Sequence, residues 1–182
     1  TIYAALAWVE HRREECEEIL ASLALVDPGD ARPEREVGRH LVELYRFAEG
    51  VPFLKRAVGR DSSDYEAWTQ LGRALSNSGD EDGAREALKS AQQAAGLRQD
   101  AWRNNTTLVL DRMLVDQTVS EHGDLTFAWA PDAADVFEVY LVPFYVDARE
   151  ELAARYGFTP PPVRIEVFRE LGDFSVRSTG FE

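Results

Sequence analysis

The chain carries three histidines, His11, His40 and His122, the residue type that most often holds a catalytic zinc ion. Zinc hydrolysis needs two histidines on one helical face and a glutamate that takes a proton from the metal-bound water. The stretch His40-Leu41-Val42-Glu43-Leu44 contains half of an inverted zinc motif, but Leu44 stands where the second histidine is required. We therefore expect no metal site in this chain, and we interpret His40 as a surface or groove residue.

Cys16 and one acidic turn are the other candidates for chemistry. Cys16 is the only cysteine, which excludes a disulfide within the chain, and we expect it to be buried rather than reactive. The turn Asp80-Glu81-Asp82-Gly83 is similar to a calcium loop. A loop counted from Ser78 would, however, end at Lys89, where calcium needs a bidentate glutamate. The sequence thus predicts no catalytic residue and no cofactor in the chain itself.

A pair of helices is predicted over Tyr65–Arg98, with a break at Gly79-Asp80. Its apolar positions are Trp68, Leu71, Gly72 and Leu75 in the first helix and Ala84, Ala87, Leu88 and Ala91 in the second. The pattern recurs 34 residues earlier, at Val37, Gly38, Leu41, Leu54 and Ala57, and again at Tyr3, Ala4, Ala7, Cys16, Leu20 and Leu23. The order W-x-x-L-G-x-x-L followed by A-x-x-x-L-x-x-A closely resembles a tetratricopeptide (TPR) repeat.

This resemblance implies a TPR-type α-solenoid of antiparallel helix pairs over residues 1–117. We expect a partial repeat at 1–30, full repeats at 31–64 and 65–98, and a capping helix at 99–117. Thr1 falls inside the first helix of a repeat and Thr1–Glu10 is apolar. Because terminal repeats normally carry a polar face, we expect this chain to be a fragment with further helices upstream.

Residues 118–182 have a different pattern, which predicts a small, incomplete α/β segment with two strands. Asp124–Trp129 and Val163–Phe168 alternate polar and apolar residues, as half-buried strands do. A long helix is expected over Pro131–Tyr156, kinked or broken near Pro143, and a short one begins in Glu170–Thr179. A strand, a helix and a strand in this order predict two parallel strands. The predicted fold class is therefore mostly α.

The second part is similar to the opening of the peptidase-MA-like (gluzincin) zinc metallopeptidases. The likeness covers Leu125–Phe181 and consists of F-x-W-x-P, a helix ending in Tyr-Gly, P-x-x-V-R-I-E-V-F and D-F-S-V-R-S-T-G-F. It implies a bacterial protein with a later HExxH helix that binds zinc, and no such motif lies within these 182 residues. The TPR part would then recruit substrates to a peptidase.

The TPR resemblance also implies a concave groove lined by the first helix of each pair. Its outward positions are Arg35, Arg39, Val42 and Glu43, then Thr69, Arg73, Ser76 and Asn77, and then Arg103. From these we take Arg35, Arg39, Arg73, Asn77 and Arg103 as the candidate binding residues. Guanidinium groups capture carboxylates in bidentate fashion, which favours an acidic protein or peptide partner. The alternative is that the arginines are solvated or paired with Glu36, Glu43 and Glu66.

The net charge of −13 argues against nucleic acid as a partner. No apolar run approaches the roughly 20 residues of a membrane span, so we expect a soluble protein. The compartment, the bacterial cytoplasm or the periplasm, stays open, and the bacterial origin is what the resemblance implies. Exposed strand edges at Leu125–Trp129 or Val163–Phe168 would favour homodimers. The sequence leaves two functions open: a protein-binding TPR scaffold, or the N-terminal part of a zinc metallopeptidase.

Overall fold

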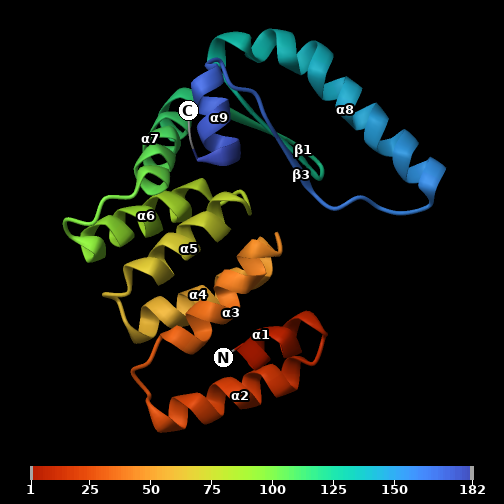
Figure 1. The fold of residues 1–182 in the computed structure, drawn as a ribbon. Helices are drawn as coiled ribbons and strands as arrows, with labels where there is room; N and C mark the ends of the chain where they lie inside the picture. The colour runs from red at the N-terminus through yellow and green to blue at the C-terminus, as the bar shows by residue number, and fades with distance from the viewer. Residues whose placement is uncertain (1, 181–182) are drawn as a thin grey trace. The chain divides into compact units, whose positions relative to one another are not determined.

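The computed structural model describes residues 2–180, and the chain divides into two compact units at Leu110–Asp111. The fold is mostly α-helical, with one small sheet, as predicted. Figure 1 shows its elements. Those of unit 1 are α1 (Ile2–Val9), α2 (Arg13–Val26), α3 (Arg32–Glu43), α4 (Phe47–Arg60), α5 (Tyr65–Ser76) and α6 (Glu81–Ala95). Helix α7 (Ala101–Asp116) begins in unit 1 and ends in unit 2.

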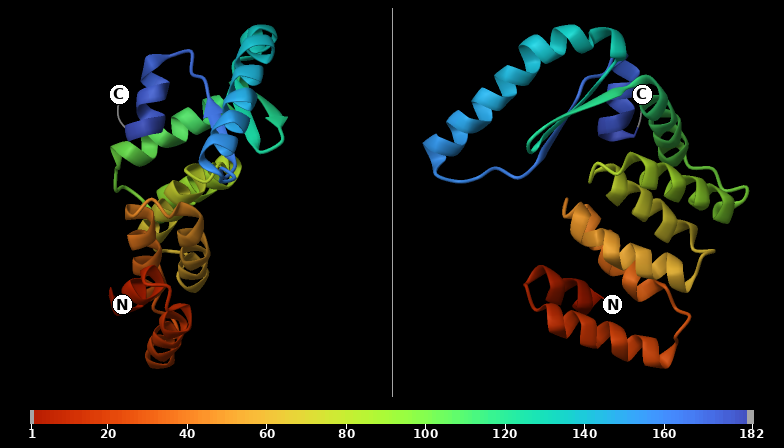
Figure 2. Two further views of the ribbon diagram at one scale, coloured as in Figure 1. Left: turned by 90° about the vertical axis from the view of Figure 1, so that its right-hand side faces the viewer. Right: turned by 180° about the vertical axis from the view of Figure 1, so that it is seen from behind.

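The helices of unit 1 form consecutive hairpins, because each second helix folds back onto the first. Helix α1 packs on α2, α3 on α4 and α5 on α6, while α3 also packs on α1 and α5 on both α3 and α4. Both views of Figure 2 show these hairpins stacked in chain order. The predicted helix pairs, including the break between α1 and α2, are thus confirmed.

A 34-residue period recurs in the backbone of unit 1, most clearly where the first helix of each hairpin ends. His11, Tyr45 and Gly79 all adopt a left-handed conformation, with φ of 64°, 59° and 83°. The residue that follows each of them donates its N–H to the carbonyl five residues back, at 2.8, 2.8 and 3.0 Å. Three turns of one geometry at one spacing show that the sequence period is also a structural period.

Small residues on the first helix let the second helix approach closely. A Cβ placed on Gly38 would lie 2.5 Å from Cγ of Leu54, and one placed on Gly72 would lie 2.6 Å from Cγ of Leu88. Both leucines are fully buried. The glycine–leucine contact is therefore made twice, 34 residues apart, and it depends on the absence of a side chain at the glycine.

Unit 2 contains a three-stranded sheet and two further helices. Its elements are β1 (Thr118–His122), β2 (Leu125–Trp129), the short 3-10 helix η1 (Pro131–Ala133), α8 (Ala134–Tyr156), β3 (Val163–Glu166) and α9 (Leu171–Thr179). The strand order is β1-β2-β3. Strand β1 runs antiparallel to β2 with Ser120 opposite Phe127, and β3 runs parallel to β2 with Ile165 opposite Phe127. The predicted parallel pair is confirmed.

One face of the sheet packs against α8 and forms the core of unit 2. Leu125, Phe127 and Trp129 of β2 are buried with Val142 of α8. Strand β1 corrects the prediction of two strands. It was missed because it holds a single large apolar residue, Val119, and is mostly exposed.

Two further expectations for unit 2 are wrong in one of their alternatives. Of the kink or break expected near Pro143, the break is wrong, because α8 is one element from Ala134 to Tyr156 with Pro143 inside it. Leu125–Trp129 is not a sheet edge, because β2 lies between β1 and β3. Strand β3 does lie at the end of the sheet, and pairing between chains through Val163–Phe168 stays a prediction.

Candidate functional site

Unit 1 contains a pocket of about 560 Å³ on the first helices of successive hairpins. It brings together three of the five predicted binding residues, Arg35, Arg39 and Arg103. The pocket is lined by Arg35, Glu36 and Arg39 of α3, by Tyr65, Glu66, Thr69 and Gln70 of α5, and by Asp100 and Arg103 at the start of α7. We call these residues the α3–α5–α7 groove.

Arg35 lies in the groove with its guanidinium surrounded by carboxylates. Its Nη1 is 2.9 Å from Asp64 and 3.0 Å from Glu66, and its Nε is 3.2 Å from Glu36. Burial lowers the pKa of Arg35, but the negative charges of Asp64, Glu66 and Glu36 outweigh it, so the pKa is raised. The positive charge of Arg35 is thus balanced by carboxylates of its own chain.

Arg39 is held in the same way, one helical turn further along α3. It pairs with Glu36 at 2.7 Å and also with Glu43. Burial raises the pKa of Glu36, but its hydrogen bonds and ion pairs with Arg39 and Arg35 outweigh that effect and lower the pKa. Glu36 therefore bridges the two arginines, and the carboxylates named as their alternative partners are the ones that they contact.

Arg103 stabilises the start of α7 and is only 2% exposed. Its Nε donates to the side chain of Gln92 at 3.2 Å, and its Nη2 donates to the carbonyl of Arg98 at 2.8 Å. Its backbone N–H donates to the carboxylate of Asp100 at 2.7 Å. The guanidinium is thus bound within the fold, where it links α7 to α6 and to the connection between them.

The other two predicted residues, Arg73 and Asn77, are not among those that line the groove. The guanidinium of Arg73 lies over the ring of Trp102, 5.9 Å from its centroid. The Asn77 side chain donates to the carbonyl of Arg73 at 2.9 Å and so satisfies a backbone acceptor at the end of α5. Both residues are exposed; Arg73 contacts α7 through Trp102, and Asn77 contacts only the end of its own helix.

Three groove residues were missed in the sequence: Tyr65, Gln70 and Asp100. Gln70 lies 34 residues after Glu36, so the repeat itself could have pointed to it. Its side-chain oxygen is buried and has no hydrogen-bond partner among the described residues. Asp100 precedes α7 and accepts the N–H of Arg103, which is typical of a helix cap.

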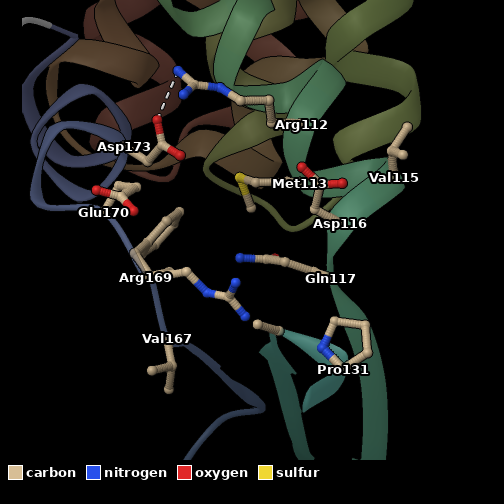
Figure 3. Close-up of a pocket in the computed structure, with 12 residues that line it drawn as sticks. Arg112, Met113, Val115, Asp116, Gln117, Pro131, Val167, Arg169, Glu170 and Asp173 are labelled. Carbon is tan, nitrogen blue, oxygen red and sulfur yellow. Dashed lines mark ion pairs between the residues drawn. The ribbon is translucent and has the colours of Figure 1, made fainter. Parts of the chain in front are cut away.

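Unit 2 has a pocket of about 520 Å³ next to α9, shown in Figure 3. Met113 and Gln117 point into it, and the guanidinium of Arg112 pairs with Asp173 at 2.7 Å. Arg169, also at this pocket, pairs with Asp132. Both cationic groups of the pocket are therefore bound by carboxylates of the same unit.

Ser120, His122 and Glu138 form a cluster between β1 and α8. Ser120 Oγ lies 2.9 Å from His122 Nε2 and donates to Glu138 at 2.5 Å, and His122 Nε2 lies 3.2 Å from Glu138. A serine–histidine–acid relay needs the serine and the acid on different ring nitrogens. Here both face Nε2, so the cluster is a polar contact between strand and helix.

No protein-family model and no curated protein matches the chain significantly. Within residues 2–180, no group of three or more histidine, cysteine, aspartate or glutamate side chains is placed to hold a metal ion. Among the same residues, a membrane-spanning helix is absent as well.

Proposed function

We propose that unit 1 is a protein- or peptide-binding module and that the α3–α5–α7 groove holds the ligand. The observation that carries this proposal is the position of the pocket. It is lined by α3, α5 and the start of α7, which follow one another in the 34-residue array. The TPR resemblance implies a groove on those helices, and repeat proteins bind partners on such extended surfaces.

The dimensions and lining of the groove suit an extended segment of polypeptide. A volume of about 560 Å³ is within the range of ligand pockets and accommodates a few side chains. Its lining combines ring surface from Tyr65 with hydrogen-bonding groups of Thr69 and Gln70. These groups would contact both the side chains and the backbone of such a segment.

The test is binding of a panel of short labelled peptides, measured by fluorescence anisotropy. Thr69→Phe would fill the groove and should abolish saturable binding. Glu86→Phe, on an exposed position of α6 away from the groove, is the matched control and should bind normally. Equal binding by both variants, or no saturable binding of any peptide, would contradict the proposal.

A second candidate is that this chain belongs to a zinc metallopeptidase and recruits its substrates. What supports it is the order β2–α8–β3, because the peptidase resemblance implies a strand, a long helix and a parallel strand. The described residues of this chain do not fit zinc. The metal would therefore be held by an HExxH helix in a longer protein. Elemental analysis of that protein tests the idea: about one zinc per chain supports it, and no bound metal opposes it.

A further inference from the structure

Each groove arginine already has partners within the fold. Arg35 contacts three carboxylates and Arg39 two, and Arg103 donates to Gln92 and to a backbone carbonyl. A ligand carboxylate would have to compete with these partners, and it would add negative charge beside the carboxylates that already surround Arg35 and Arg39. The arrangement therefore disfavours the acidic ligand expected from the sequence.

The groove does have unused acceptors. Glu66 is 54% exposed at its side chain, and Asp100 is exposed at the start of α7. A carboxylate has about four acceptor sites. Glu66 contacts Arg35 and accepts the hydroxyl of Tyr65, and Asp100 accepts the N–H of Arg103, so these contacts use only some of the sites. A ligand that brings N–H donors would complete these groups.

The charges around the groove also favour a cationic ligand. Glu36, Glu66 and Asp100 line the groove together with three arginines, and Asp64 and Glu43 add two more carboxylates through their ion pairs with Arg35 and Arg39. Arg98, whose guanidinium lies over the ring of Tyr65 at 5.1 Å, adds one cation. Carboxylates still outnumber guanidinium groups there, and the whole chain carries −13.

We infer that the ligand of the α3–α5–α7 groove is a cationic peptide segment, whose lysine or arginine side chain pairs with Glu66 and Asp100. This inference rests on the proposed peptide-binding function and specifies the chemical class of its ligand. Charge-assisted hydrogen bonds to carboxylates are stronger than neutral ones, which would favour a cation over a neutral segment at this position.

The experiment compares three fluorescein-labelled peptides, (Lys-Ala)₄, (Ser-Ala)₄ and (Glu-Ala)₄, by anisotropy titration of the full chain at low salt. The lysine peptide should bind most tightly and the glutamate peptide most weakly. Glu66→Gln and Asp100→Asn should each weaken binding of the lysine peptide by about two- to fivefold, the effect of losing one exposed ion pair. Both substitutions keep an acceptor oxygen for the internal hydrogen bonds.

Glu86→Gln is the control for attraction to the negatively charged chain as a whole, because it removes the same charge from an exposed position of α6 outside the groove. An equal loss in this variant would overturn the inference, since the binding would then be non-specific. Tighter binding of the glutamate peptide would overturn it too, yet leave the peptide-binding function intact. Failure of all three peptides to bind would count against both proposals.

Discussion

Gly38 offers the sharpest test of how the hairpins of unit 1 pack. Gly38→Ala would place a methyl group 2.5 Å from Cγ and 2.8 Å from Cδ2 of Leu54, closer than carbon atoms approach in folded proteins. Leu54 is fully buried, so it cannot move away into solvent. The helix α3 or the leucine must shift.

The expected cost follows from two opposing effects. Overpacking of a buried site costs about 1–3 kcal/mol, while replacing glycine by alanine inside a helix gains about 1 kcal/mol of helix propensity. The net effect should be destabilising by about 1 kcal/mol, and Gly72→Ala should behave alike because its Cβ would lie 2.6 Å from Leu88. Gly59→Ala in α4 meets nothing within 4 Å and should stabilise by about 0.5–1 kcal/mol.

Urea denaturation of the full chain, followed by circular dichroism, measures these differences as shifts of the midpoint. Truncation of the partner supplies a further check, because Gly38→Ala should cost less in a Leu54→Ala background than in the native chain. If Gly38→Ala stabilised the protein as much as Gly59→Ala, the close contact between α3 and α4 would be refuted.

Three other predictions concern single residues. Gly79→Ala should destabilise by about 1–2 kcal/mol because φ is 83°, whereas Tyr45→Gly at the equivalent turn, where φ is 59°, should not lower the denaturation midpoint. Burial raises the pKa of Glu166, but Arg177 and a second arginine outweigh it and lower the pKa below 4.5. The stabilisation that the Glu166 carboxylate supplies is thus present above pH 4.5 and is lost as the pH falls through its folded-state pKa. Melting temperatures should show this loss in the native chain and not in Glu166→Gln. Burial, with the charge of Glu17, raises the pKa of Cys16 to about 11, so the native thiol should resist Ellman's reagent at pH 8 and react only after unfolding.

The helices of unit 1 were predictable because one period controls them. Apolar positions of the 34-residue pattern, such as Leu41 and Leu75, are buried in each hairpin, and the same turn follows each first helix. Strand β1 was not predictable in this way. It is stabilised by pairing with β2 across a turn at Gly123, where φ is 61°, and not by an apolar face of its own.

The groove was only partly predictable from the sequence. Its location on the first helices follows from the repeat, but the state of its arginines depends on partners distant in the chain. Asp64 reaches Arg35 from 29 residues away, and Gln92 reaches Arg103 from 11. Periodicity does not determine which carboxylate meets which guanidinium. The pairing state of the groove arginines was therefore not predictable from the sequence.

Buried and groove positions of the array differ in how they change from one repeat to the next. Gly38 and Leu54 recur as Gly72 and Leu88, and Ala4 and Leu20 stand at the same positions of the first hairpin, because the close contact between two helices tolerates only a small residue opposite the leucine. In the groove, Arg35 is followed by Thr69 and Arg103, and Glu36 by Gln70. In the proposed function, these groove side chains determine which donors and acceptors face the ligand. Substitutions at the recurring positions should therefore alter stability. Among the variable positions, Thr69 should alter the choice of peptide at nearly constant stability, whereas Arg35 and Arg103, which are bound within the fold, should alter stability as well.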